Sequence, residues 1–258
     1  MATYEETARA SRIKCLELVF RAQTSHIGSV LGVADIMVVL FEQDLKINRF
    51  ICSKGWVACL IYYHQARKRL IPKEDLERYC LEGEEKYIGL IEPIGGFGAE
   101  FAGGSMQMGV AAGVGLALAK KIKKEDGKIF VLESDGAIAG GMIWESASIA
   151  SQHKLSNLCV IFEINGWQAM GKTEDILDMS PLRDKFESFG WEVTEIDGHD
   201  YAQIEESLKK ETNKPHCVLA KTVKGKGVSF MEKDGLMWHY KNIPEDLYKL
   251  AMEELCQK

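Results

Sequence analysis

The chain has 258 residues, enough for one large α/β domain, and its 46% apolar and 27% charged residues are typical of a globular protein. Its net charge of −6 predicts no basic surface for nucleic acid and no attraction to anionic membranes. No stretch approaches the ~18 consecutive apolar residues of a membrane span, and the polar amino terminus lacks a secretory apolar core. Seven cysteines without a Cys-x-x-Cys pair indicate reduced thiols, no zinc site and a cytoplasmic protein.

Along the chain, apolar runs alternate with segments of helical spacing. Strands are expected at 128–132, 158–162, 191–196 and 217–223. Helices are expected at 5–20, 33–41, 110–122, 142–150, 201–210 and 245–255, with a further helix opening at Pro72. This alternation predicts an α/β fold, a doubly wound and mainly parallel sheet with helices on both faces. No repeat or linker interrupts it, so residues 1–258 are expected to form a single domain.

An acid and an amide come directly after two of these strands. Asp135 follows the strand at 128–132, and Asn165 follows the next strand, one βαβ crossover later. Ligands of open α/β sheets bind beyond the carboxyl ends of the strands, so both side chains are expected to point into one crevice. Their hard oxygen atoms suit Mg²⁺ or Ca²⁺, and Mg²⁺ completes its shell with water and substrate phosphates, which predicts a diphosphate ligand. Alternatively, Asp135-Gly136 and Asn165-Gly166 are two ordinary turns.

Asp-Gly followed one crossover later by Asn resembles the metal–diphosphate motif of thiamine diphosphate enzymes. Further segments, in the same order along the chain, resemble the amino-terminal, diphosphate-binding subunit of a split transketolase. They are Trp144-Glu-Ser-Ala, His153-Lys-Leu-Ser-Asn-Leu, Asn165-Gly-Trp-Gln, Gly171-Lys-Thr-Glu-Asp, Phe189-Gly-Trp-Glu-Val, Asp197-Gly-His-Asp and Lys221-Thr-Val-Lys-Gly-Lys-Gly-Val-Ser-Phe-Met-Glu. The resemblance extends from Ser25 to His239, and several motifs in register make it far more specific than any one motif.

The resemblance implies the thiamine diphosphate-binding fold, with thiamine diphosphate and Mg²⁺ as cofactors and Ca²⁺ as the alternative ion. The side chains of Asp135 and Asn165 and the backbone carbonyl of Trp167 would then hold the metal. The Gly136 amide would face a phosphate oxygen, with Ala137 beside it, because backbone donors at a strand–helix turn bind anions.

Other segments correspond to the cofactor pyrimidine and to the substrate. In the glycine-rich stretch 87–109, Gly104-Ser105-Met106 matches the segment that contacts the aminopyrimidine. His26 and His239 keep the positions of histidines that face the substrate, so the resemblance implies that both act in catalysis.

The chain departs from the family on the substrate side. Trp56, expected beside the cofactor, and Leu90 replace two histidines, and an indole offers one donor, no acceptor and far more volume. Gly140 stands where a glutamate usually helps couple two cofactor pockets across a dimer, and the family's Gly-Gln-Gly has become Gln107-Met108-Gly109. These changes predict a transketolase-like enzyme that transfers a two-carbon ketol unit, or forms a related C–C bond, with an unusual donor or acceptor.

In the family, the activating glutamate and the aromatic wall around the pyrimidine lie on a second domain, which is absent from this sequence. The resemblance therefore implies a partner subunit with the pyrimidine-binding and carboxy-terminal domains, an α2β2 heterotetramer, small carbonyl substrates, and no activity of the single chain. Two alternatives stay open: a non-catalytic homologue, and the α subunit of a 2-oxo acid dehydrogenase. The segments that begin at Gly171 and Lys221 favour the transketolase over the dehydrogenase.

Overall fold

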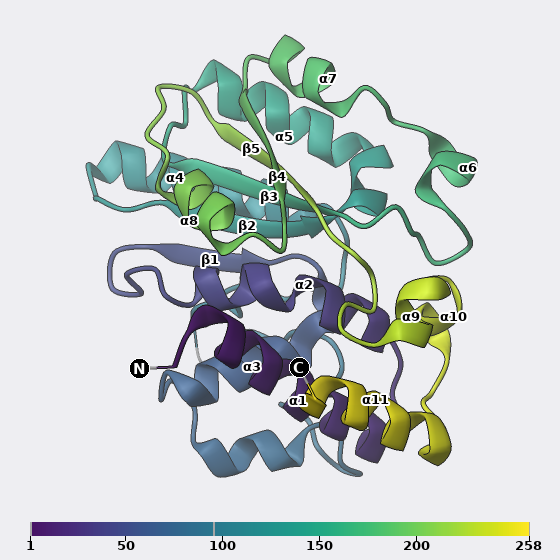
Figure 1. Cartoon of the computed structure of the whole chain (residues 1–258). Coiled ribbons are helices and arrows are strands. Elements are labelled where there is room, and N and C mark those ends of the chain that lie inside the picture. The colour runs from purple at the N-terminus through teal and green to yellow at the C-terminus, as the bar shows by residue number, and fades with distance from the viewer. Residues whose placement is uncertain (1, 95, 258) are drawn as a thin grey trace.

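The computed structural model describes residues 2–94 and 96–257. Its strands form one five-stranded sheet in the order β1-β2-β3-β5-β4, and every neighbouring pair is parallel. They are β1 (Arg49–Cys52), β2 (Ile129–Ser134), β3 (Leu158–Ile164), β4 (Glu192–Asp197) and β5 (His216–Lys221). Helices lie on both faces of this sheet (Figure 1), which confirms the predicted doubly wound architecture.

Two layers of helices enclose the sheet. One face packs against α1 (Tyr4–Ala22), α2 (Ile27–Leu40), α3 (Ala58–Arg67) and α8 (Tyr201–Lys209), with α11 (Glu245–Gln257) lying against α1. The other face packs against α4 (Met108–Lys123), α5 (Gly141–Gln152) and α7 (Leu182–Ser188). Short helices lie in the connections: η1 (Gly55–Val57), η2 (Lys73–Arg78), η3 (Asp135–Ala139), α6 (Thr173–Leu177), α9 (Ser229–Lys233) and α10 (Met237–Tyr240).

The central strands are buried on both sides, because their alternate side chains enter different cores. In β2, Phe130 and Leu132 pack into the core beneath α1, α2 and α3, whereas Ile129 and Val131 pack into the core beneath α4 and α5. Both faces must therefore be apolar, and this is why continuous apolar runs indicated the strands correctly.

Helix α2 is buried along its whole length and presents no polar face. Two glycines in its first half let other backbone segments approach closely: a Cβ at Gly28 would lie 3.1 Å from the carbonyl oxygen of Trp238, and one at Gly32 would lie 3.1 Å from that of Val223. A helix that is buried on all sides lacks the amphipathic pattern, and the predicted range 33–41 therefore missed its first two turns.

Some local predictions were incomplete or wrong. The segment after Pro72 forms the short 3₁₀ helix η2, with Pro72 as its N-cap, and not an α-helix. Strand β1 was not predicted, because four residues are too few to show a period. Within the described ranges, no helix combines the length and the apolar character needed to cross a bilayer.

The packing of α4 on β2 predicts that alanine substitutions at two glycines of α4 change the stability of the protein in opposite directions. A Cβ at Gly113 would lie 2.5 Å from Cγ2 of buried Val131, whose β-branched side chain has little freedom to move, whereas one at Gly115 meets nothing within 4 Å. We expect Gly113→Ala to lower the free energy of unfolding by about 1–3 kcal/mol. We expect Gly115→Ala to raise it by about 0.5–1 kcal/mol. Urea denaturation measures both, and equal effects would contradict the close packing of α4 on β2.

Candidate functional site

The carboxyl ends of β2 and β3 bring the predicted acid close to the loop that carries the predicted amide. These strands pair directly, with Ser134 opposite Glu163, and Asp135 begins η3 immediately after β2. The Asp135 carboxylate is only 5% exposed, and its Oδ2 accepts hydrogen bonds from the Gly166 amide at 2.8 Å and from Thr173 Oγ1 at 3.2 Å. These two bonds fasten the end of β2 to the loop that follows β3.

Asn165 folds this loop back on itself. Its Oδ1 accepts a hydrogen bond from the Trp167 amide at 2.9 Å, and its Nδ2 donates to Glu163 Oε2 at 2.9 Å. Between them, Gly166 adopts a left-handed backbone with φ of 75°, a conformation that favours glycine. The structure thus gathers Asp135, Asn165 and Trp167 around one residue, Gly166.

The turn after Asp135 differs in detail from the expectation. The Gly136 amide, predicted to face a phosphate oxygen, donates to Asp135 Oδ1 at 2.9 Å, and Ala137 is buried within η3. The Gln168 side chain packs over Gly136, and its Nε2 is buried without a hydrogen-bond partner among the described residues. An unpaired buried amide next to the predicted metal ligands indicates that a polar ligand belongs here.

A cavity of about 410 Å³ opens beside Asp135. Its lining comes from η3, the end of β3, the loop after β3, α6, the segment between α6 and α7, and the start of α7: Asp135, Ile138, Ile164, Gly166, Trp167, Lys172, Thr173, Glu174, Asp178, Met179, Ser180 and Leu182. Within residues 2–94 and 96–257, no three His, Cys, Asp or Glu side chains gather to hold a metal. The predicted ligands are one carboxylate, one amide and one carbonyl, and such a small set of oxygen donors fits Mg²⁺ with water and phosphate as the other ligands.

A buried ion pair stands next to these ligands. Lys54 Nζ contacts Glu163 Oε2, and the Thr222 hydroxyl donates to Glu163 Oε1 at 2.8 Å. Burial alone would lower the pKa of Lys54, but the charge of Glu163 raises it above its ordinary value overall. Burial and the same Glu163 charge raise the pKa of Asp135. The site therefore holds two close carboxylates that require positive charge nearby.

Lys224 adds a second buried cation. It is 2% exposed, and its Nζ lies 2.8 Å from His239 Nδ1. Burial, followed by the charge of Lys54, lowers the pKa of Lys224 to about 8. No carboxylate among the described residues forms an ion pair with it, although a buried ammonium normally has such a partner. The charges of Glu163 and Asp135 act on Lys224 only from a distance, so an anionic ligand in direct contact would stabilise this buried ammonium.

The two predicted histidines and Trp56 lie together next to Lys224. The His26 and Trp56 rings are stacked with centroids 4.4 Å apart and planes within 4°, and the His239 ring lies 4.8 Å from that of His26. Trp56 is 47% exposed, so it forms the outer wall of this cluster. Burial, followed by the charge of Lys224, lowers the pKa of His26 to about 4 and that of His239 to about 3, so both rings are neutral at pH 7.

Each histidine uses one ring nitrogen within the protein. His26 Nδ1 lies 2.7 Å from Ser25 Oγ, and His239 Nδ1 lies 2.8 Å from Lys224 Nζ. Within the described part of the chain, neither Nε2 has a hydrogen-bond partner, so both are available to a ligand. The backbone joins the two residues as well, since the His26 amide donates to the His239 carbonyl oxygen at 3.0 Å.

The predicted pyrimidine-contacting segment lies beside Trp56. A Cβ at Gly55 would lie 3.2 Å from the Gly104 amide nitrogen, while Ser105 and Met106 are exposed at the surface. Gly95, which belongs to the same glycine-rich stretch, lies outside the described residues. Gly104 thus lies against the residue that precedes Trp56, and the structure shows no contact between the three predicted residues and Asp135.

Gln107 and Gly140, two positions at which the chain differs from the family, lie next to each other in the structure. A Cβ at Gly140 would lie 1.8 Å from Gln107 Nε2, so the Gln107 side chain fills the volume that a side chain at position 140 would need. Gln107 also has a left-handed φ of 75°, in a place where the related segment has glycine. The missing side chain at position 140 is therefore replaced in space by a neutral amide from the neighbouring loop.

Three site residues were not predicted: Lys54, Glu163 and Lys224. A single acid within the apolar run of β3 was a signal for Glu163, because a charge in a doubly buried strand needs a partner. Lys224 belongs to the segment that begins at Lys221, and Lys54 lies two residues before Trp56, yet the burial of both lysines follows only from the fold.

Comparisons with known proteins identify the family of this chain. The family described as "Transketolase, thiamine diphosphate binding domain" matches residues 3–240. One subunit of the apulose-4-phosphate transketolase of Phocaeicola vulgatus is 32% identical over 99% of this chain and 95% of its own length. The 6-deoxy-6-sulfo-D-fructose transketolase subunit SqwG of a Clostridium species is 30% identical over 97% of this chain and 95% of its own length.

A solved structure shares the fold. The transketolase of Campylobacter jejuni superposes with a TM-score of 0.85 at 28% identity, and the match covers 99% of this chain but 43% of that one. The similar subunits therefore match this chain end to end, whereas the larger transketolase contains further domains. These findings confirm the resemblance: the chain belongs to the transketolase family, as the thiamine diphosphate-binding subunit of a split, two-component transketolase-like enzyme.

Proposed function

We propose that this subunit binds the diphosphate of thiamine diphosphate through Mg²⁺ and, with its partner, transfers a two-carbon ketol unit between small carbonyl compounds. The observation that carries the proposal is the meeting of Asp135 and Asn165 around Gly166, next to the largely buried Lys54 and the buried Lys224. A carboxylate and an amide suit the metal, and the lysines suit the negative charge of a diphosphate.

The metal ligands would be the Asp135 and Asn165 side chains and the Trp167 carbonyl, with Ca²⁺ as an alternative ion. Thiamine diphosphate supplies a nucleophilic carbanion and an electron sink for C–C bond cleavage when it is bound. This chain orients that cofactor through its diphosphate, and the unpaired Gln168 amide is free to donate a further hydrogen bond.

His26 and His239 would hold the hydroxyl and carbonyl groups of the substrate. Both rings are neutral at pH 7. His239 Nδ1 accepts from the Lys224 ammonium, so its Nε2 carries the proton and donates, whereas His26 Nε2 donates or accepts according to its tautomer. The Ser25 and Lys224 contacts fix the opposite ring nitrogens, which holds both rings in one orientation.

The partner would supply the pyrimidine-binding and carboxy-terminal domains, with the active site at the interface of an α2β2 heterotetramer. The names of the similar subunits, each one part of an enzyme, and the 43% coverage of the Campylobacter transketolase support this assignment. Residues 1–258 would then be one domain, working in the cytoplasm. Neither a non-catalytic role nor a 2-oxo acid dehydrogenase accounts for the site and the similarities together.

The substrate would differ from the common sugar phosphates. Trp56 covers one face of His26, and Leu90 replaces a second imidazole, so fewer groups are available for sugar hydroxyls. Two of the similar subunits carry names with uncommon substrates, apulose 4-phosphate and 6-deoxy-6-sulfo-D-fructose, which supports a variable substrate side in these enzymes.

Removing the Asp135 charge tests the metal–diphosphate site. In the mixed two-subunit enzyme, we expect Asp135→Asn to weaken binding of thiamine diphosphate with Mg²⁺ at least about a hundredfold in calorimetric titration, because a neutral amide is a far weaker metal ligand. Asp178→Asn is the matched control, since Asp178 lines the same cavity but is exposed, and it should bind as the wild type does. Unchanged affinity in Asp135→Asn would contradict the site.

The lowered pKa of Lys224 predicts proton uptake on binding. At pH 8 the free lysine is about half protonated, and a nearby diphosphate raises its pKa, so binding takes up about half a proton. The neutral histidines do not contribute at this pH. Calorimetry in buffers of different ionisation enthalpy measures this uptake. The Lys224→Gln variant should lose this proton uptake. Equal uptake in both proteins would contradict a diphosphate bound next to Lys224.

Restoring an imidazole tests the substrate assignment. We expect the wild-type enzyme to turn over xylulose 5-phosphate and ribose 5-phosphate poorly. Trp56→His should raise kcat/KM for this pair about tenfold or more, because it uncovers His26 and adds a hydrogen-bonding ring. Trp56→Phe controls for the loss of the indole. Efficient turnover of this pair by the wild type would refute the altered substrate side.

A further inference from the structure

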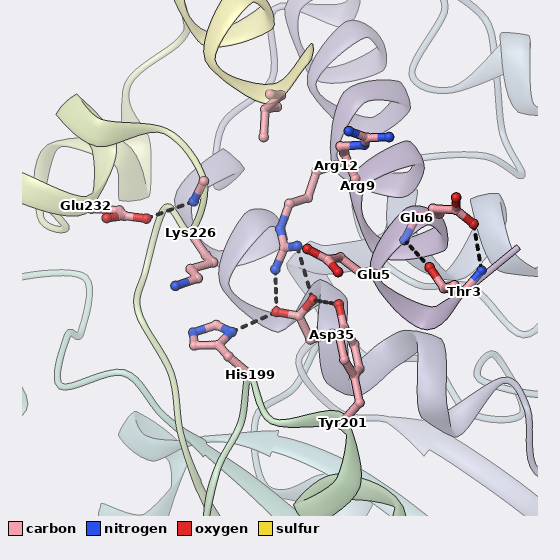
Figure 2. Close-up of a pocket in the computed structure, with 12 residues that line it drawn as sticks. Thr3, Glu5, Glu6, Arg9, Arg12, Asp35, His199, Tyr201, Lys226 and Glu232 are labelled. Atoms are coloured by element: carbon pink, nitrogen blue, oxygen red, sulfur yellow. Dashed lines mark hydrogen bonds and ion pairs between the residues drawn. The ribbon is translucent and has the colours of Figure 1, made fainter. Parts of the chain in front are cut away.

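A second polar cluster consists of Arg12 on α1, Asp35 on α2, and His199 and Tyr201 after β4 (Figure 2). A cavity of about 650 Å³ opens between α1, α9 and the loop before α9, and Asp35, Arg12 and His199 are among its lining residues. No residue of this cluster was predicted to have a function. The cluster nevertheless contains a buried carboxylate, Asp35, and burying a charge is costly unless other interactions compensate it.

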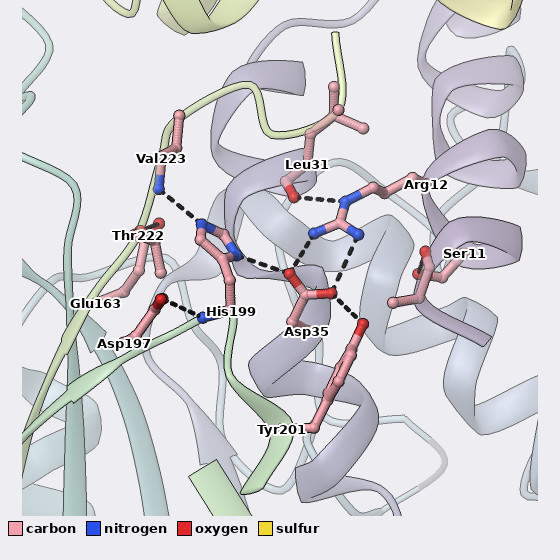
Figure 3. A network of polar contacts seen from close by, with 12 residues as sticks. Ser11, Arg12, Leu31, Asp35, Glu163, Asp197, His199, Tyr201, Thr222 and Val223 are labelled. Carbon is pink, nitrogen blue, oxygen red and sulfur yellow. Dashed lines mark hydrogen bonds and ion pairs between the residues drawn. The ribbon is translucent and has the colours of Figure 1, made fainter. Parts of the chain in front are cut away.

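Asp35 lies in the middle of α2 and is almost fully saturated with hydrogen bonds. Arg12 donates to both of its oxygen atoms, at 3.1 and 2.6 Å, and Tyr201 donates at 2.7 Å. His199 Nδ1 lies 2.7 Å from Oδ2 (Figure 3). Burial would raise the pKa of Asp35, but the hydrogen bond from His199 and the charge of Arg12 lower it to about 2. Asp35 is therefore a permanent carboxylate at neutral pH.

This carboxylate determines which nitrogen of His199 accepts. The other ring nitrogen, Nε2, receives the backbone N–H of Val223 at 2.9 Å. A backbone amide only donates, so Nε2 carries the lone pair and Nδ1 carries the proton that points to Asp35. His199 thus serves as a neutral bridge from a buried charge to one peptide group of the loop after β5.

That peptide group begins the segment that brings Lys224 to the site. The Gly225 amide donates to the Gly28 carbonyl at 2.8 Å, at the start of α2, and Lys224 Nζ reaches His239. The Val223 side chain is exposed, so the segment is not anchored by burial of Val223. Its position between Thr222 and Gly225 depends on hydrogen bonds, from the Thr222 hydroxyl to Glu163 and from the Val223 amide to His199.

We propose that His199 is a positioning residue: with Asp35 behind it, it holds the Val223 amide and thereby sets where Lys224 and His239 stand. Only the effect on the cofactor rests on the proposed function; the effect on the segment 222–226 does not. The cavity next to the imidazole is large enough to admit water, so removing the ring leaves a hydrated space and does not force the surrounding core to collapse.

Hydrogen exchange on the full chain with its partner tests this inference. We expect His199→Ala to speed amide exchange in peptides that cover 222–226 at least about tenfold, with little change elsewhere, because the Val223 amide loses its acceptor. His199→Gln, whose side-chain amide has both a donor and an acceptor, should recover most of the protection. Tyr201→Phe is the matched control: Asp35 loses one hydrogen bond from a residue that does not touch the segment, and exchange there should stay at the wild-type rate.

Three results would overturn the inference: unchanged exchange at 222–226 in His199→Ala, the same acceleration in Tyr201→Phe, or no recovery in His199→Gln. As a second readout, we expect His199→Ala to raise the Kd of thiamine diphosphate with Mg²⁺ about tenfold, again with recovery in His199→Gln. If the wild-type enzyme bound no thiamine diphosphate, the proposed function would fail, and the exchange result would still decide the role of His199.

Discussion

The hydrogen bond from the Gly166 amide to the Asp135 carboxylate is the contact on which the candidate site depends. It joins the end of β2 to the loop after β3. The direct parallel pairing of these two strands holds their carboxyl ends side by side. Asn165 completes the arrangement by holding the Trp167 amide. The apolar cores on both faces of the sheet thus serve the site, because they fix the strands whose ends carry the ligands.

The balance of buried charges determines which ligands the candidate site favours. Asp135 and Glu163 are two buried carboxylates, and Lys54 compensates one of them directly. Lys224 contributes a further positive charge, whose lowered pKa reflects its burial and the neighbouring Lys54. An ammonium group held in this way is costly on its own and favourable once an anion is bound, so the chain is preorganised for a negatively charged ligand. Burial, followed by this positive charge, keeps the two histidines neutral at pH 7.

Much of this could be predicted from the sequence, for identifiable reasons. The strands of a doubly covered sheet need continuous apolar runs, and this requirement located β2 and β3 and with them Asp135 and Asn165. The first half of α2 was missed, because a helix buried on every side shows no amphipathic period. Lys54 and Lys224 lie far apart in sequence, and only the fold brings the charge of Lys54 close enough to lower the pKa of Lys224. The replacement of a side chain at Gly140 by Gln107 is also a spatial relation that a linear pattern does not contain.

The location of the metal in the two-subunit enzyme tests the central claim most directly. Crystals of the complex grown with thiamine diphosphate and Mn²⁺ in place of Mg²⁺ would give an anomalous signal from the ion. We predict one strong peak between the Asp135 carboxylate, the Asn165 amide oxygen and the Trp167 carbonyl, in contact with the diphosphate. A peak elsewhere, or a diphosphate bound without contact to this loop, would contradict the account.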